Sequence, residues 1–486
     1  MLFNSYAFIF IFLPSVLVLY FVLNRLSTRA GKTVLLASSL FFYGYWSYKY
    51  LFLLVFSILF NYCAAAVILK SENNIRKNYL AAAIILNVFL LGYFKYTDFF
   101  ISSVNSTFYA DFPLPGIILP LGISFFTLQQ IAFLMDCYEG LIKRNSFLNY
   151  SLFVTFFPQL VAGPIVHYRE TVPQFDDQSK KAFVFPNFIY GLFIFSLGLF
   201  KKTALADQLA KLAAAGFDTP EPVSFAVSWL ASLSFSMQIF FDFSGYTDMA
   251  LGLAVMFNIY LPQNFRSPYS AASIIDFWKR WHITLTVFLT NYVYTALARR
   301  LKHFSFHKAM AITMITFAVS GIWHGASWMF VIFGLLHGAG IIINHYWKKH
   351  GFRLGSLTAW FITINYVNIC FVFFRAQELK DAFNLLHAMF NPYKAAEALR
   401  TAFAYIKNLN VDILMQLNSS YLAFAAGITV CILLSRMPEK KPGALDGYSR
   451  TGVFSLSTGF IAGIMLWISF KIMLGEPSKE FVYFAF

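Results

Sequence analysis

The chain has 486 residues, of which 59% are apolar and only 12% are charged, with a formal net charge of +15. Soluble domains carry roughly 25% charged residues, so this composition excludes an ordinary water-soluble globular protein. The lysines and arginines are spread over short connections between apolar runs. That distribution favours the positive-inside bias of membrane proteins over a nucleic-acid surface, and we expect no nucleic-acid partner.

Apolar runs recur from one end of the chain to the other, and several approach or reach the roughly 20 residues that cross a bilayer. They are Ala7–Leu23, Leu51–Leu69, Leu80–Leu91, Ile117–Met135, Phe188–Phe200 and Tyr421–Leu434. No positive charge precedes the first run and no small-residue cleavage site follows it, so we expect it to remain as a spanning helix. The pattern predicts an all-α, polytopic membrane protein with about 11–14 spanning or partly spanning helices.

The connections between the early runs alternate in charge. Arg25–Lys32 and Lys70–Lys77 are basic, Ser103–Pro115 has no Lys or Arg, and Lys143–Arg144 is basic again. Basic connections favour the cytoplasmic side, so we expect an extracytoplasmic N-terminus. A final span near Val453–Ile472 would place the C-terminus on the same outer side.

Two stretches interrupt apolar runs with polar and helix-breaking residues, Gln159–Pro164 and Asp242–Asp248. Irregular backbone at membrane depth is tolerated only where protein or a water-filled cavity surrounds it. We therefore expect these breaks to border a cavity or funnel. Residues 375–420 mix both charge signs and are typical of amphipathic surface helices.

Cysteine and histidine spacing predicts no metal site and no disulfide framework. The cysteines lie far apart, beside or within apolar runs, and we expect free, buried thiols at all of them. They are Cys63, Cys137, Cys370 and Cys431. His303 and His307 have i, i+4 spacing, but no Glu follows the first histidine as a zinc protease needs. Their basic surroundings indicate a solvated connector.

His282 closes the segment Asp276-Phe-Trp-Lys-Arg-Trp-His. Asp276 and Arg280 are four residues apart and can pair on one helix face, while Trp278 and His282 would share another. The alternative is an aromatic and basic belt at a membrane surface. That alternative is weaker for His282, because this residue begins the apolar stretch Ile283–Leu289.

His324 lies between the apolar stretches Ala309–Val319 and Met329–Leu336, so we expect it within the membrane. An ionisable side chain there is costly and usually functional. Gly321 and Gly325 bracket it and allow close backbone approach or a local helix break. A neutral imidazole at this place can accept a proton from a hydroxyl during acyl transfer. The alternative is a hydrogen-bonded core histidine.

Several segments, taken together and in order, resemble the bacterial membrane-bound O-acyltransferases, especially the alginate O-acetyltransferase membrane subunit. They are Met1–Ser5, Leu119–Thr127, Leu160–Pro164, Phe240–Ala250, Asp276–His282, Gly321–Trp328 and Phe373–Ala376. The resemblance implies a ring of tilted helices around a central tunnel in a single membrane domain. We divide that domain into N-terminal helices (1–145), a catalytic core (146–350), C-terminal helices (351–474) and an extracytoplasmic tail (475–486).

By this resemblance His324 is the catalytic residue and His282 its supporting partner. We expect further residues to line or brace the tunnel: Asp242, Tyr246, Asp248, Arg280, Trp281, Ser320, Trp323 and His337. The segment Glu480–Phe486 resembles the Phe-x-Tyr-Phe-x-Phe ending of many bacterial members and of the small peptide that accompanies the D-alanyl branch. In that peptide the tyrosine carries the acyl group, and the resemblance implies the same role for Tyr483. Tyr483 could return to an outward funnel, because about 11 residues at roughly 3.3 Å each reach ~36 Å. The alternative is an aromatic tail without a chemical role.

The resemblance further implies an O-acetyltransferase of the bacterial cytoplasmic (inner) membrane that uses acetyl-CoA and no bound cofactor. Its expected partners are the lipid bilayer, an extracytoplasmic SGNH-hydrolase-like protein and a polysaccharide acceptor. Asn291–Arg300 lacks the glycines typical of alginate-type members, and Leu336–Asn344 is closer to the D-alanyl transferase branch. Transfer of D-alanyl or another acyl group to a cell-wall polymer therefore remains an alternative.

Two alternatives belong to other classes of protein. A transporter or lipid flippase would suit broken helices around a cavity, but the chain shows no internal repeat of the kind that many such proteins carry. A non-catalytic assembly platform for envelope enzymes is the other.

Overall fold

The computed structural model describes residues 1–219, 223–397, 400, 424–429, 456–475 and 479–482, and this part of the chain is helical without a strand. The main helices in chain order are α1 (Leu13–Leu26, preceded by the π-helix η1, Phe8–Phe12), α2 (Thr28–Gly44), α3 (Tyr48–Lys70), α4 (Asn73–Phe108), α5 (Ile123–Tyr138), α6 (Phe147–Thr155), α7 (Phe157–Leu160), α8 (Tyr168–Asp176), α9 (Phe185–Phe200), η3 (Lys201–Ala206), α10 (Asp207–Phe217), α11 (Phe225–Met256), α12 (Ile274–Trp278), α13 (Ile283–Leu289), η5 (Thr290–Tyr294), α14 (Thr295–Ala298), α15 (Phe306–His324), α16 (Trp328–Lys349), α17 (Ser356–Arg375), α18 (Leu379–Phe390) and α23 (Leu456–Gly475).

Within the described residues, 8 helical segments are long and apolar enough to cross a membrane. They are Phe8–Leu26, Tyr48–Lys70, Asn74–Phe108, Phe185–Phe217, Phe225–Met256, Phe306–His324, Trp328–Lys349 and Ser356–Arg375. The predicted all-α, polytopic architecture is confirmed. The number of full spans is below the total expected from the sequence, since helices such as the 16-residue α5 are too short to count. Residues 401–423 and 430–455 lie outside the described part.

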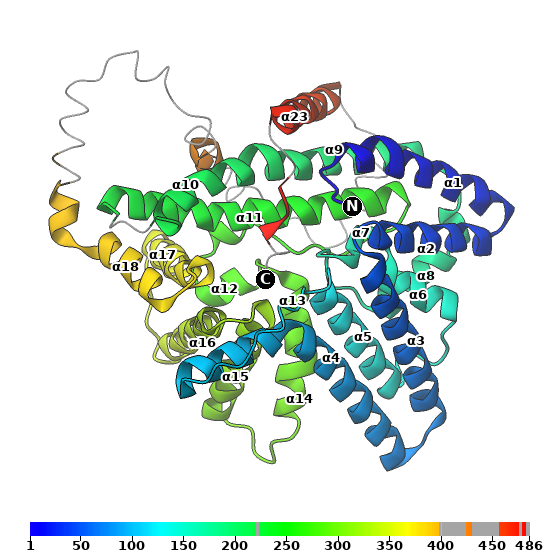
Figure 1. Cartoon of the computed structure of the whole chain (residues 1–486), viewed down its shortest axis with the longest axis horizontal. Coiled ribbons are helices and arrows are strands. Elements are labelled where there is room, and N and C mark those ends of the chain that lie inside the picture. Colours follow the sequence, from blue (N-terminus) through cyan, green and yellow to red (C-terminus); the bar gives the residue numbers. More distant parts are fainter. Residues whose placement is uncertain (220–222, 398–399, 401–423, 430–455, 476–478, 483–486) are drawn as a thin grey trace.

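The helix α11 is the most buried of these segments and forms the centre of the fold. Figure 1 shows α9 and α10 running along α11, with α23 beyond α9. The helices α3, α4 and α5 form a group at one end of the molecule, and α15 to α18 form another around the opposite half of α11. His282 precedes α13, and His324 ends α15 at the place where α4 of the first group contacts α15 of the second.

The predicted apolar run 117–135 is helical only from Ile123 onward. Gly122 has φ 71°, and a Cβ there would lie 2.8 Å from the carbonyl oxygen of Leu160. Only glycine tolerates both the left-handed backbone and this close approach. The turn before α5 therefore packs directly on the predicted interruption Gln159–Pro164, which is confirmed because α7 ends at Leu160.

The predicted break at Asp242–Asp248 is wrong, because α11 runs through it without interruption. A Cβ at Gly245 would lie 2.8 Å from the carbonyl oxygen of Gly198, so the glycine serves close packing of α11 against α9. The two carboxylates form ion pairs with lysines of η3 (Lys201–Ala206). An acidic side chain without a partner can hydrogen-bond to nearby backbone groups and so disrupt a helix. Because these two carboxylates bind lysines of a neighbouring helix, the backbone hydrogen bonds of α11 remain intact.

Three basic segments meet at one face of the molecule. The Arg76 guanidinium donates to the carbonyl oxygen of Cys137 (2.6 Å), and that of Arg299 pairs with Glu139 (3.2 Å). The connections α3–α4, α5–α6 and α14–α15 therefore share a side. A common side is what positive-inside bias requires, and the orientation of the termini stays a prediction.

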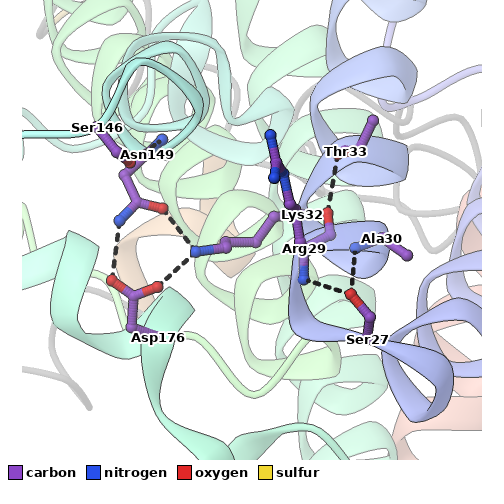
Figure 2. Close-up of polar contacts among 8 residues, drawn as sticks. All are labelled: Ser27, Arg29, Ala30, Lys32, Thr33, Ser146, Asn149 and Asp176. Carbon is purple, nitrogen blue, oxygen red and sulfur yellow. Dashed lines mark hydrogen bonds and ion pairs between the residues drawn. The ribbon is translucent and has the colours of Figure 1, made fainter.

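A polar contact joins α2 to α6 and α8 (Figure 2). The Ser27 hydroxyl caps α2 by accepting from two backbone N–H groups of its first turn. One turn on, the Lys32 ammonium donates to Asn149 Oδ1 (2.8 Å) and pairs with Asp176, whose second oxygen accepts from Asn149 (2.8 Å). The first helices are thereby tied to the middle of the chain.

The remaining sequence expectations have mixed outcomes. Cys137 and Cys370 are free and buried as predicted, but Cys63 is exposed on the outer surface of α3, and Cys431 lies outside the described residues. His303 and His307 are exposed, as expected for a solvated connector. In the predicted amphipathic region, α18 buries residues such as Leu385 while its charged residues face outward.

Candidate active site

Both histidines lie at helix ends and are buried next to each other. His282 is the residue before α13 and is 0% exposed, and His324 is the last residue of α15 and is 4% exposed. Their ring centroids are 6.4 Å apart, with 60° between the ring planes. Residues that are 42 positions apart in the sequence thus form one pair in the interior.

The backbone of His282 is left-handed, with φ 44° and ψ 52°, a conformation rarely adopted by residues other than glycine. The following turn is held by Asn264, whose carbonyl oxygen accepts from the Ile283 N–H (2.9 Å). The Asn264 side-chain oxygen accepts from the Thr284 hydroxyl (2.6 Å). These bonds keep the turn, and with it the imidazole of His282, in one orientation.

The predicted shared face of Trp278 and His282 is wrong, because α12 ends at Trp278 and the chain turns before α13 begins. The neighbouring prediction is confirmed: Arg280 Nε lies 2.9 Å from Asp276 Oδ1. Trp281 is buried and stacks on Phe277, with centroids 5.5 Å apart. The segment therefore turns its tryptophans inward, while Lys279 is exposed and the Arg280 side chain is only 16% exposed.

Aromatic rings enclose the histidine pair. The Trp323 ring lies 5.0 Å from His324 and 6.0 Å from His282. Phe243 of α11 lies 4.7 Å from His282, and Phe374 of α17 lies 5.5 Å from His324. This wall keeps the two imidazoles in a water-poor environment, where electrostatic interactions are stronger than in water.

Two glycines allow α15 and α16 to pack closely enough to form the site. A Cβ at Gly321 would lie 2.3 Å from the carbonyl oxygen of Phe330, and one at Gly325 would overlap the Phe330 ring. The helix α15 ends at His324, and Gly325 continues in an extended conformation. Both effects predicted from the glycines, close approach and a helix break, are confirmed.

The end of α15 is capped by two adjacent residues of α4. The Lys95 ammonium donates to the carbonyl oxygens of Trp323 (2.6 Å) and His324 (3.1 Å), and the Tyr96 hydroxyl donates to that of Ile322 (2.7 Å). The last carbonyl groups of a helix have no partner within the helix and need donors from elsewhere. Here α4 supplies these donors for three successive residues.

His337 is a third buried histidine close to the pair. The Trp278 indole N–H donates to His337 Nδ1 (3.1 Å), so a neutral His337 carries its proton on Nε2. The ring of Phe333 separates the two imidazoles, with centroids 4.6 Å from His337 and 5.8 Å from His324. His337 therefore lies in the layer behind His324.

A cluster of charged groups lies on α11 and η3. Lys202 is 1% exposed and pairs with Asp242 (2.6 Å) and Asp207 (3.0 Å). Asp248 pairs with Lys201, six residues farther along α11 than Asp242. Asp242 is thus placed beside the site, while Asp248 braces the α9–α11 packing.

The segment 479–482 contacts this cluster, with Phe481 buried and Lys479 and Glu480 exposed. The Val482 N–H donates to Asp242 Oδ2 (2.8 Å), and the Lys202 ammonium donates to the carbonyl oxygen of Glu480 (2.9 Å). Phe481 is 2% exposed and packs edge-on against Tyr246, with centroids 4.7 Å apart. Phe481 therefore returns to the interior, whereas Tyr483, whose return was predicted, lies outside the described residues.

A cavity of about 360 Å³ lies next to this segment. Its lining includes Met1, Trp46, Ser124, Phe125 and Glu480. The Phe125 ring is 5.4 Å from that of Trp323, so these two side chains separate the cavity from His324. The predicted cavity is confirmed beside Gln159–Pro164, since Val161 lines it, whereas no residue of Asp242–Asp248 belongs to its lining.

Three buried polar groups were not anticipated from the sequence: Lys95, Lys202 and the set formed by Asp136, His167 and Tyr292. The Tyr292 hydroxyl bonds Asp136 (2.8 Å) and lies 3.2 Å from His167 Nδ1. Each of these three groups contains a titratable side chain within or beside an apolar run. A titratable side chain in such surroundings usually has a function or a charged or hydrogen-bonding partner. Ser320 is buried on α15 one turn before His324, as expected for a site residue.

A chain whose described residues are helical, with 8 segments able to cross a membrane, is a polytopic membrane protein, and this one encloses two adjacent histidines at helix ends. Comparison with known proteins makes the class specific. The chain belongs to the membrane-bound O-acyltransferase (MBOAT) family, whose model matches residues 124–376. It is therefore an O-acyltransferase. The matched region contains both histidines and ends at Ala376, just after α17.

Individual relatives agree with this assignment. The chain is 39% identical to a peptidoglycan O-acetyltransferase of Helicobacter pylori over 100% of its own length and 98% of that protein. It is 34% identical to the probable alginate O-acetylase AlgI of Pseudomonas aeruginosa over 80% of this chain and 75% of that protein. A teichoic acid D-alanyltransferase of Bacillus subtilis is 28% identical over 54% of this chain and 69% of that protein.

Proposed function

We propose that this protein O-acetylates a polysaccharide of the cell envelope, with peptidoglycan as the first candidate. The similarity to the peptidoglycan enzyme covers both chains from end to end, while that to the alginate enzyme covers less of each. The likeness to the D-alanyl branch is lower in identity and extent, so D-alanyl transfer is the second candidate.

The buried histidine pair carries the proposal. His324 would accept the proton of an acceptor hydroxyl while the hydroxyl oxygen attacks the acyl carbon. With acetyl-CoA as the donor, the new C–O bond forms as the C–S bond breaks, and the imidazolium returns its proton to the leaving thiolate. His282 would hold the hydroxyl or its proton opposite His324. The aromatic wall supports this role, since it excludes water that would otherwise hydrolyse the thioester.

The docked tail supports a relay through Tyr483. Tyr483 directly follows Val482, whose N–H group binds Asp242, and the next residue of α11, Phe243, contacts the ring of His282. We propose that the Tyr483 phenol first receives the acetyl group. A phenolate leaves more readily than an alkoxide, so an aryl ester can pass the group onward to a polysaccharide hydroxyl.

The arrangement of charge and cavities supports transfer across the membrane. The three basic connections share the face that we assign to the cytoplasm, where an anionic donor such as acetyl-CoA would arrive. The cavity beside Glu480 is lined by the N-terminal residues and the connection before α5, which we assign to the outer side. We propose that an SGNH-hydrolase-like partner takes up the group there.

The test is complementation of a deletion strain with the natural chain, His324→Ala, His282→Ala and Tyr483→Phe at matched protein levels. O-acetyl and D-alanyl esters are measured by mass spectrometry in digested peptidoglycan and in exopolysaccharide. We expect His324→Ala to lower acetylation by about 10²–10⁴-fold, the usual contribution of a general base. Acetylation that persists without His324 contradicts the assignment and favours a transporter or assembly platform. Unchanged product in Tyr483→Phe contradicts the relay alone.

A further inference from the structure

Lys95 is a buried lysine, and the groups that its ammonium contacts among the described residues are neutral. It belongs to the long helix α4 and is nine-tenths buried. Its ammonium group contacts the carbonyl oxygens of Trp323 (2.6 Å) and His324 (3.1 Å) and the hydroxyl of Ser124 (3.5 Å). Among the described residues it forms no ion pair with Asp or Glu. A charge buried in this way is expensive unless its environment compensates it.

The compensation comes from the end of α15. The carbonyl groups of the last turn carry the negative end of the helix dipole, which stabilises a cation placed there. The same carbonyl groups would otherwise be unsatisfied inside a membrane, at a cost of several kcal/mol each. Lys95 and the end of α15 thus depend on each other, and His324 is the residue at which they meet.

We propose that Lys95 is a positioning residue for His324, an inference that rests on the proposed acyl transfer. Its ammonium group holds the backbone of His324 against α4, a helix of 36 residues, and so fixes where the imidazole lies. In its protonated form it also places a positive charge beside the site where the attacking oxygen becomes negative. A fixed charge of this kind stabilises a transition state without reorganisation.

Tyr96 offers a matched comparison within the same contact. Its hydroxyl donates to Ile322, also in the last turn of α15, but it carries no charge and does not touch His324. If the cap only stabilises the helix end, the loss of either donor has a similar effect. If Lys95 positions His324, the two losses differ in catalysis while they resemble each other in stability.

The experiment compares Lys95→Met, Lys95→Arg and Tyr96→Phe with the natural chain and with His324→Ala, each purified in lipid nanodiscs. Acetyl-CoA is the probe, with soluble peptidoglycan fragments as the hydroxyl acceptor, so that continuous thiol release gives kcat and KM. Thermal unfolding reports stability. Methionine keeps most of the length of lysine and removes the donors and the charge, whereas arginine retains both. In Lys95→Met we expect kcat to fall by about 100-fold with KM nearly unchanged, since a shift of about 1 Å costs that much.

We expect Tyr96→Phe to lower kcat by about threefold at most, and Lys95→Arg to recover at least part of the loss in Lys95→Met. The inference is overturned if Lys95→Met keeps its kcat, if Tyr96→Phe loses as much as Lys95→Met, or if Lys95→Met loses activity only in proportion to unfolded protein. The natural chain and His324→Ala separate the two proposals. Equal thiol release by both overturns the acyl transfer at His324, whereas an inactive His324→Ala beside a fully active Lys95→Met overturns only the role of Lys95.

Discussion

Replacement of Lys202 by methionine is expected to lower the free energy of unfolding more than replacement of any other lysine described above. The Lys202 ammonium lies 2.6 Å from Asp242 and 3.0 Å from Asp207, whose side chains are 1% and 13% exposed. It also donates to the carbonyl oxygen of Glu480 at 2.9 Å. Without this cation, two carboxylates remain buried without their counter-charge.

The magnitude follows from these contacts. Removing one partner of a buried ion pair costs about 3–5 kcal/mol, because the other charge stays uncompensated. The lost hydrogen bond to the Glu480 carbonyl adds about 1 kcal/mol. We therefore expect Lys202→Met to lower the free energy of unfolding by about 4–6 kcal/mol, and addition of Asp242→Asn to restore part of it.

Lys32→Met is the matched control, since it removes a lysine from a pair whose carboxylate, Asp176, is 50% exposed (Figure 2). Water compensates that carboxylate, so the expected loss is about 1 kcal/mol or less. The free energy of unfolding is measured by titrating each detergent-solubilised protein with sodium dodecyl sulfate and following tryptophan fluorescence. Equal losses in Lys202→Met and Lys32→Met would refute the reasoning.

Two further predictions concern packing. Gly321→Ala places a Cβ 2.3 Å from the Phe330 carbonyl oxygen and should cost about 1–3 kcal/mol in the same titration, with reduced acetylation. Gly459→Ala meets no atom within 4 Å and should cost nothing, so equal losses in the two variants would argue against close packing of α15 on α16. Phe481→Ala removes the ring that packs on Tyr246 and should weaken tail docking by about 3–5 kcal/mol. Limited proteolysis should then cleave the tail faster while thermal unfolding of the helices stays the same, and an unchanged cleavage rate would contradict the prediction.

The parts of the fold that could be predicted from sequence are those that depend on local composition. The first apolar run became the span Phe8–Leu26, because a bilayer selects length and apolar character alone. The position of His324 at a helix end could also be predicted, since Gly321 and Gly325 indicate close packing and a helix break. The structure differs from the predictions at Gly122, where a turn precedes α5, and at Asp242, where α11 is unbroken. Both differences depend on which helix packs opposite, and a local sequence pattern does not contain that information.

The supporting residues of the site could be only partly predicted for the same reason. A lone lysine in an apolar run indicates that a partner must exist, but it does not indicate which one. Lys95 bonds a carbonyl group 228 residues away, and Lys202 bonds one 278 residues away. His282 was recognised by its motif, yet its left-handed backbone depends on the bonds from Asn264 to the turn that follows it.

The contact between the two ends of the chain determines when the site can be completed during synthesis. The Asn4 side chain donates to the carbonyl oxygen of Lys479, 475 residues later, and Asp242 binds the N–H of Val482, 240 residues later. At synthesis rates of about 5–20 residues per second, roughly 24–95 s pass between translation of Asn4 and of Lys479. In the last part of that interval, after His324 has been translated, the nascent chain contains both histidines but not the segment that contacts Asp242. Completion of the site is therefore a late event, which follows membrane insertion of the helices that carry the histidines.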